Sequence, residues 1–251
     1  MSFLRFQIIL GVLLAPSMLI AEPGVDFSNG ALPGPFKASY ALISKGLRIG
    51  VMERELMIED DGVHAFRSES KASGLVRLFR KDHIVELTRW IEEGPRFKPV
   101  NYEYQRSGGD KEKSVSVYFD QESNKIKTTV NDQSWHMDLE PETLDKLLYQ
   151  VVLMRDLAAG ERVLEYHIAD GGKVKVYRLV TIGNEQVDTP LGQFDAIKLR
   201  REKKDSKREA ILWCAPTLNY LPVKVDYREK DGELTTAVLN SLTGINLPGQ
   251  L

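Results

Sequence analysis

The sequence predicts a mostly β fold: a curved antiparallel sheet or half-open β-barrel of about twelve strands, with one main amphipathic helix. Two observations lead to this prediction. Short segments that alternate apolar and polar residues recur at nearly even spacing, separated by turn residues such as Gly, Pro, Asn and Asp. One further segment instead has leucine and valine at three- and four-residue spacing. A meander of short strands favours an antiparallel sheet that curves or closes.

The first 21 residues are expected to lie outside the fold. Arg5 provides a positive start, residues 6–20 are largely apolar, and Ala21 is a small residue at the end of this run. An apolar run of roughly 15 residues before a small residue is typical of a cleavable signal peptide. An uncleaved N-terminal anchor is the alternative. We therefore expect an exported, periplasmic protein, with residues 22–34 as an irregular leader rich in Pro and Gly.

The alternating segments form a single predicted domain over residues 35–241, followed by a tail over residues 242–251. Lys45-Gly46 is expected to turn the chain between the first two strands. The predicted strands cover residues 36–42, 47–56, 63–70, 83–91, 97–105, 114–119, 125–130, 162–168, 173–182, 194–201, 210–214, 221–227 and 234–241.

The helix is predicted over residues 141–158. Pro141 suits its first turn, acidic residues lie near its start, and Gly160 can end it. Its apolar face is expected to lie on the curved sheet. We take four residues of this face, together with a tryptophan of a later strand, as candidate ligand-binding residues: Leu144, Leu147, Leu148, Val151 and Trp213.

No recognisable catalytic centre is present in the sequence. The four histidines are scattered without metal-ligand spacing, and the lone Cys214 lies in an apolar strand, where a buried structural thiol is expected. No nucleophile elbow, phosphate-binding loop or HExxH motif occurs. The sequence therefore indicates a non-enzymatic protein without a metal or cofactor.

Two basic stretches are candidate surfaces for a lipid or an acidic partner. The first interleaves apolar and basic residues and contains Arg77, Arg80 and Lys81. The second contains Arg200, Arg201, Lys203 and Lys204. An ordinary sheet connection and a solvated hairpin tip are the respective alternatives. Removing residues 1–21 takes away only Arg5 and changes the net charge from −2 to −3, which argues against nucleic-acid binding.

The run from Ala210 to Tyr227, with Trp213 followed by Pro216 and Leu221-Pro222-Val223, carries a family resemblance. It looks like the closing hairpin of a family of exported bacterial domains of unknown function, numbered 3108. Further stretches that look like that family are Phe36 to Tyr40 with Ile49-Gly50, Asp188 to Phe194, and the helix before Gly160. A similar hairpin occurs in periplasmic lipoprotein carriers, whose half-open sheet encloses an apolar cavity under helices. The resemblance implies a related architecture, with the helix as lid or plug.

Two hypotheses about function follow. In the first, the protein is a non-enzymatic periplasmic binder that holds an apolar ligand, such as a lipid or acyl group, or a hydrophobic partner segment in its concave sheet. In the second, it is a cell-envelope scaffold or adaptor with a packed core, acting through an exposed strand edge, a surface patch or the basic loop. Peripheral membrane contact is compatible with both, and the sequence leaves the oligomeric state open.

Overall fold

The computed structural model describes residues 32–74, 77, 81–94, 96–109, 112–202 and 208–247. Within these residues the chain forms one sheet of 15 strands and the helix α1 (Leu148–Ala158). The strands are β1 (Phe36–Ser44), β2 (Leu47–Ile58), β3 (His64–Ala72), β4 (His83–Glu93), β5 (Arg96–Ser107), β6 (Lys113–Asp120), β7 (Lys125–Val130), β8 (Gln133–Asp138), β9 (Thr143–Leu144), β10 (Leu164–Ala169), β11 (Val174–Thr189), β12 (Gly192–Glu202), β13 (Glu209–Ala215), β14 (Leu221–Arg228) and β15 (Leu234–Thr243).

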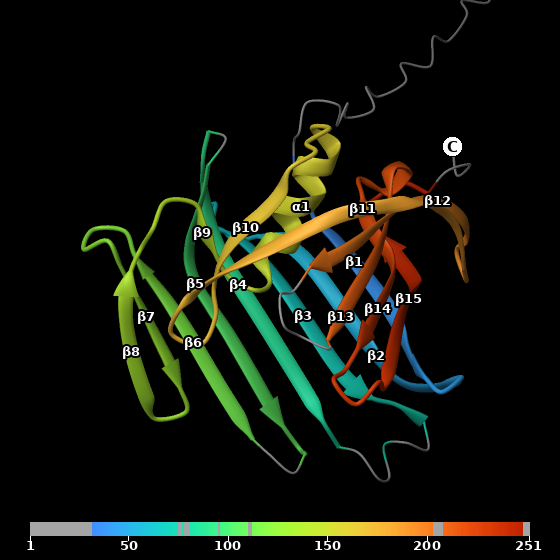
Figure 1. Ribbon diagram of the computed structural model, residues 1–251, viewed down its shortest axis with the longest axis horizontal. Coiled ribbons are helices and arrows are strands. Elements are labelled where there is room, and N and C mark those ends of the chain that lie inside the picture. The colour runs from blue at the N-terminus through green and yellow to red at the C-terminus, as the bar shows by residue number, and fades with distance from the viewer. Residues whose placement is uncertain are drawn as a thin grey trace, which may run out of the picture.

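The sheet is a meander whose first and last strands pair at its centre. Its order runs from β8 to β1 and continues from β15 to β9, and every neighbouring pair except β9 and β10 is antiparallel. The sheet curls so that β10 and β11 cross in front of β3, β4 and β5, and α1 is enclosed between these two walls (Figure 1). The predicted curved sheet with one helix is therefore confirmed, although the strand number is 15 rather than about twelve.

Local sequence explains the first hairpin. Lys45 and Gly46 both have positive φ values, 50° and 75°, as the type I′ turn of a two-residue hairpin requires. Farther along β2, a Cβ atom at Gly50 would lie 2.7 Å from the backbone oxygen of Lys71. Only glycine fits at that position without moving β3. The close approach of β3 therefore explains why position 50, in the Ile49-Gly50 pair, is a glycine.

The two strands that sequence analysis did not predict are the two edges of the sheet. β8 is exposed at five of its six residues, so it has no buried face and no apolar alternation. β9 falls inside the predicted helix 141–158, because Thr143 and Leu144 pair in parallel with His167 and Ile168 of β10. At the other end of the chain, β15 continues to Thr243, two residues beyond the predicted end of the domain.

The helix α1 starts at Leu148 because Asp145 satisfies the free backbone groups of its first turn. The Oδ1 atom of Asp145 accepts hydrogen bonds from the backbone N–H groups of Leu147 (2.8 Å) and Leu148 (2.9 Å). The helix ends at Ala158, and Gly160 follows the C-cap residue Ala159 with a φ of 76°, the left-handed conformation that the sequence predicts after the helix C-terminus.

The core lies between α1 and the concave face of the sheet. Seven of the eleven helix residues are buried, and they point in all directions around the helix axis. The helix is thus a plug inside the barrel and is covered on more sides than an amphipathic helix lying on a sheet. The same buried cluster includes, from the sheet, Phe36, Phe66, Trp90, Val117, Ile126, Leu164 and Ile168.

Candidate functional site

A cleft opens where the two ends of the curled sheet meet. The chain passes directly from edge strand β8 through residues 139–142 to edge strand β9. Beside this connection lies a cavity of about 630 Å³, which we call the seam cleft. Its walls come from the start of β5, the β6–β7 turn, residues 139–144, the face of α1 that carries Val152 and Arg155, and β10. A volume in this range is typical of small-molecule sites, roughly 300–1,000 Å³.

The seam cleft has an apolar floor and a charged rim. Phe97, Leu144 and Val152 supply apolar surface from a strand, an edge strand and the helix. The rim carries both signs of charge: Arg96, Lys98, Glu140, Glu142 and Glu165. Such an arrangement can receive a molecule or segment that is partly apolar and partly polar.

Three side chains form a fixed polar group on the helix side of the seam cleft. The guanidinium group of Arg155 lies 4.5 Å from the ring centroid of Phe97 and donates to Oδ1 of Asp156 through Nε (3.0 Å) and Nη2 (2.7 Å). The hydroxyl group of Tyr166 donates to the other carboxylate oxygen at 3.0 Å. Burial and the neighbouring Asp156 carboxylate raise the pKa of Tyr166 above its ordinary value.

One polar atom that belongs to this cleft has no partner among the described residues. The hydroxyl oxygen of Thr143 is buried and makes no hydrogen bond there. Because an unsatisfied buried hydroxyl costs about 1–3 kcal/mol, a ligand that reached it would recover part of that cost.

Asp145 anchors the start of α1 to the sheet. It is completely buried, and its Oδ2 atom accepts a hydrogen bond from the hydroxyl group of Thr88 in β4 at 2.6 Å. Burial raises the pKa of Asp145 to about 6, while the hydrogen bonds from Thr88 and the helix amides oppose the increase. This one carboxyl therefore connects the plug helix to the wall of the barrel.

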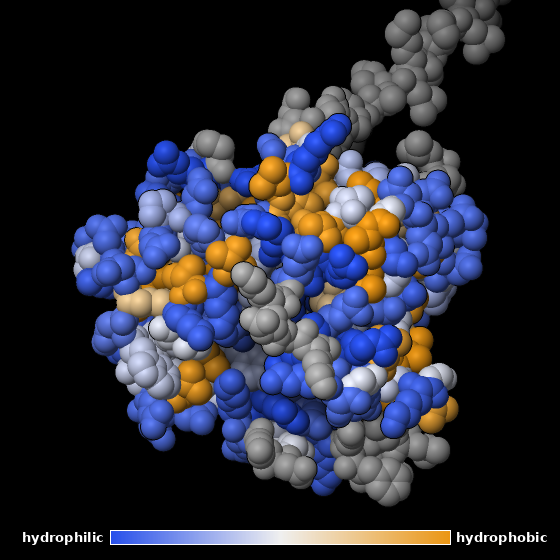
Figure 2. All heavy atoms as spheres, in the orientation of Figure 1, coloured by the Kyte–Doolittle hydropathy of each residue, from blue (hydrophilic) through white to orange (hydrophobic). Residues whose placement is uncertain are grey.

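The concave face below α1 is polar. The ammonium group of Lys146 lies 5.4 and 5.5 Å from the ring centroids of Tyr102 and Tyr104. The hydroxyl group of Tyr102 donates to Glu86 at 2.6 Å, and Asp170 is 3.8 Å from Lys146. In Figure 2, hydrophobic residues gather near α1, and the coloured residues visible around the centre of the face below it are mainly hydrophilic. The concave face is thus not one continuous apolar surface.

The predicted ligand-binding residues are separated by the structure. Leu144 lines the floor of the seam cleft. Leu147, Leu148 and Val151 are at most 1 % exposed and pack within the core. Trp213 is also buried, but it lies on the sheet face opposite to Cys214. Its cross-strand partners are Lys198 and Lys224, whose ammonium groups lie 4.9 and 4.2 Å from the Trp213 ring centroid.

The predicted basic residues lie mainly at the surface. Arg77 and Lys81 are exposed and line a second cavity of about 660 Å³ beside β3 and β4. Arg200 is exposed, whereas the guanidinium group of Arg201 lies 4.7 Å from the ring centroid of Tyr177. Arg80, Lys203 and Lys204 lie outside the described residues.

No pattern in the sequence singles out the site residues Phe97, Val152, Arg155, Asp156 and Tyr166. They belong to β5, α1 and β10, and no local motif joins them. Only the curling of the sheet brings the start of β5 against the helix, so the contact between Arg155 and Phe97 carries no signal in the sequence.

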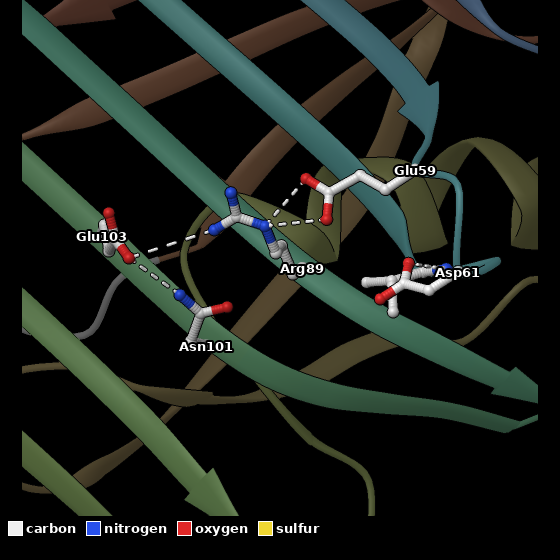
Figure 3. Close-up of polar contacts among 6 residues, drawn as sticks. Glu59, Asp61, Arg89, Asn101 and Glu103 are labelled. Carbon is white, nitrogen blue, oxygen red and sulfur yellow. Dashed lines mark hydrogen bonds and ion pairs between the residues drawn. The ribbon is translucent and has the colours of Figure 1, made fainter.

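The described residues contain no group of three or more His, Cys, Asp and Glu side chains that could hold a metal ion. The histidines have separate surroundings: His64 stacks on Trp90 with ring centroids 5.4 Å apart, whereas His83 contacts Glu69 at 2.9 Å. On the convex face, Arg89 donates to Glu59 at 2.9 Å and lies 4.0 Å from Glu103 (Figure 3). The His83–Glu69 and Arg89–Glu59 ion pairs lie at different positions along β4 and do not line one common cavity.

The fold and the cleft define a class: a β-barrel-like protein with a half-open, helix-plugged sheet. The chain belongs to the family described as protein of unknown function DUF3108, whose model matches residues 36–239. The resemblance found in the sequence is thereby confirmed. No curated protein matches the chain.

Two solved structures are similar to the chain. The first is a β-barrel-like protein of domain of unknown function DUF1849 from Brucella abortus, at 12 % identity and a TM-score of 0.52. The match covers 84 % of this chain and 98 % of that one, and it shows a shared fold. The second is a proposed lipoprotein from Parabacteroides distasonis, at 11 % identity and a TM-score of 0.36, covering 86 % of this chain and 98 % of that one.

Within the described part of the chain, none of the helices has the length and apolar character needed to cross a membrane.

Proposed function

We propose that this protein is a non-enzymatic binding protein of the periplasm that holds a partly apolar ligand in the seam cleft. The ligand class is a lipid or acyl group, or a hydrophobic segment of a partner protein. The observation that carries the proposal is the cleft itself, about 630 Å³ with an apolar floor of Phe97, Leu144 and Val152 under a charged rim. The periplasmic location is based on the predicted signal peptide of residues 1–21.

The rest of the concave face supports this choice of site. The plug helix fills the apolar half of that face, and Lys146, Tyr104 and Asp170 make the other half polar. An apolar group is therefore best accommodated at the seam. Both carboxylate oxygens of Asp156 are engaged by Arg155 and Tyr166, so Asp156 holds these two side chains in place at the cleft.

The test is native mass spectrometry of the exported protein, with organic extraction of any bound species. The variants Phe97→Ala and Val152→Phe change the floor of the cleft, and Ile182→Phe is the control because Ile182 is 40 % exposed on β11. We expect a reproducible extracted species in the wild type and the control, and a reduced amount in the two cleft variants. Thermal unfolding of each variant establishes that it is folded.

A clean mass for the wild-type protein, together with no binding of an apolar dye, would overturn the ligand-binding proposal. A bound species that the cleft variants retain in full would show that the seam cleft is not the site.

A second candidate function is an envelope adaptor that pairs with a strand of another protein. The observation that favours it is β8, an exposed edge strand with a free side and without lysine or proline to block pairing. Ser134→Lys would add a blocking charge to this edge. We expect that variant to lose partners that the wild-type protein retains in co-purification, and equal recovery from both would exclude β8 as the docking edge.

A further inference from the structure

Two connections that carry basic residues, the β1–β2 turn and the β3–β4 connection, lie at the end of the strands that is remote from the seam cleft. The cleft is walled by the β4–β5 end and the β6–β7 turn, whereas the β1–β2 turn and the β3–β4 connection lie at the other end of the same strands. The backbone N–H of Ser73 donates to the carbonyl oxygen of Ile49 at 3.1 Å, which places these two connections side by side. We call this surface the basic rim and define it by the residues Lys45, Leu47, Arg48, Lys71, Arg77 and Lys81.

All five cations of the basic rim are exposed. Lys45 lies in the first hairpin turn and Arg48 lies just after it, while Lys71, Arg77 and Lys81 line the cavity of about 660 Å³ on the convex face. Arg77 and Lys81 form no ion pair with any residue that the structure describes. Five like charges in one region produce a positive potential that attracts an anionic surface.

The two acidic residues that line the same cavity are both paired with cations. Glu69 contacts Arg67, Nε2 of His83 at 2.9 Å and, at 3.9 Å, the Lys71 ammonium group of the rim itself, and the hydrogen bonds from Arg67 and His83 lower the pKa of Glu69. Asp82 accepts hydrogen bonds from Nε (2.9 Å) and Nη2 (2.6 Å) of Arg106. Arg77 and Lys81 therefore leave the cavity with a positive charge that the described acidic residues do not balance.

An exposed apolar side chain lies among these cations. Leu47 is 67 % exposed at the start of β2. It follows the turn residues Lys45 and Gly46 and directly precedes Arg48. An apolar side chain surrounded by basic residues is suited to the interface of an anionic bilayer. The apolar side chain enters the headgroup region, while the cations remain at the bilayer surface near the lipid phosphates. An acidic protein surface would match the charges but would leave Leu47 without an apolar environment.

We propose that the basic rim docks the protein on a membrane surface that contains anionic phospholipids. Docking in this orientation directs the seam cleft away from the bilayer, so the cleft stays open to the aqueous phase. The membrane contact does not depend on the proposed ligand, because the two surfaces occupy opposite ends of the strands.

The test is co-sedimentation of the exported protein with vesicles of phosphatidylethanolamine and phosphatidylglycerol, compared with vesicles of phosphatidylcholine alone. We expect binding to the anionic vesicles only, weakened by 0.5 M salt because the attraction is screened. Each neutralised cation at an anionic surface is worth about a five-fold change in affinity, so Arg77→Gln with Lys81→Gln should weaken binding about 25-fold. Lys127→Gln with Arg162→Gln is the matched control, since both residues are exposed and lie away from the basic rim.

A second pair of variants separates the apolar contact from the charges. Leu47→Ser should weaken binding about tenfold, whereas Val163→Ser, at a residue that is 81 % exposed before β10, should leave it unchanged. Equal binding to neutral and anionic vesicles would overturn the proposal. It would also be overturned if the double glutamine variant of the rim bound as tightly as its control, or if the protein bound no vesicle.

Discussion

The burial of Asp145 predicts an unusual dependence of stability on pH. Asp145 is fully buried and has a pKa of about 6, compared with about 4 in an unfolded chain. Between these two values the folded protein binds a proton that the unfolded chain releases. Protonated Asp145 therefore stabilises the fold below about pH 4, and this contribution is lost as the pH rises through about 6.

The size of the effect follows from the shift. About two pH units correspond to about 3 kcal/mol of unfolding free energy, the most that this residue can contribute between pH 4 and pH 8. Asp145→Asn keeps an oxygen that can accept from the Leu147 and Leu148 amides, but it removes the titration. As the pH rises from 4 to 8, the unfolding free energy of the wild type should therefore fall by up to about 3 kcal/mol relative to that of Asp145→Asn.

Urea unfolding monitored by tryptophan fluorescence, at intervals between pH 4 and pH 8, measures this difference. Other titrating groups affect both proteins equally, so only the difference between the two pH profiles is attributed to Asp145. Parallel profiles would refute the reasoning, and so would a difference that moves in favour of the wild type with rising pH.

Three further predictions concern the core and the sheet. Cys214 is fully buried with its pKa raised to about 12, so a thiol reagent at pH 8 should modify it only after unfolding, and rapid labelling of the native protein would contradict this. Leu148→Ala should cost about 2–5 kcal/mol of unfolding free energy because Leu148 is 0 % exposed, whereas Leu47→Ala, at 67 % exposure, should cost less than about 0.5 kcal/mol. Gly50→Ala should lower the unfolding free energy by about 1–3 kcal/mol, since its Cβ would lie 2.7 Å from a backbone oxygen of β3. Gly34→Ala is the control, because a Cβ there would have nothing within 4 Å. Equal stabilities of the two variants in urea would refute the clash.

These results also bear on experiments with the predicted ligand-binding residues. Leu147, Leu148 and Val151 are buried in the core, so polar substitutions there would unfold the domain before they reported on a ligand. Phe97 and Val152 are the informative positions, because both line the seam cleft.

Much of the fold could be predicted from local patterns. Strands with one buried face, such as β6, show alternating apolar and polar residues, and the turn at Lys45-Gly46 is specified by the two residues themselves. The same applies to the end of α1 at Gly160. Each of these features depends on interactions within a few residues, and the amino-acid sequence alone was sufficient for them.

The edges of the sheet and the start of the helix were decided by the tertiary structure. Strand β8 has no buried face, and Thr143 pairs with β10 about 24 positions along the chain, so neither has a local signature. Asp145 was placed in the first turns of a longer helix, whereas contact with Thr88 makes it the anchor from which a shorter helix starts.

The sequence by itself determined the class of protein: a β-rich domain of the DUF3108 family with one helix and with basic stretches at Arg77 and Lys81. Only the tertiary structure decided where a ligand could bind. The alternation in β13 assigns Trp213 and Cys214 to opposite faces but does not say which face is concave. Closure of the sheet around α1 fills the expected cavity with Leu147, Leu148 and Val151 and leaves open space at the seam, because distant segments meet there without filling it.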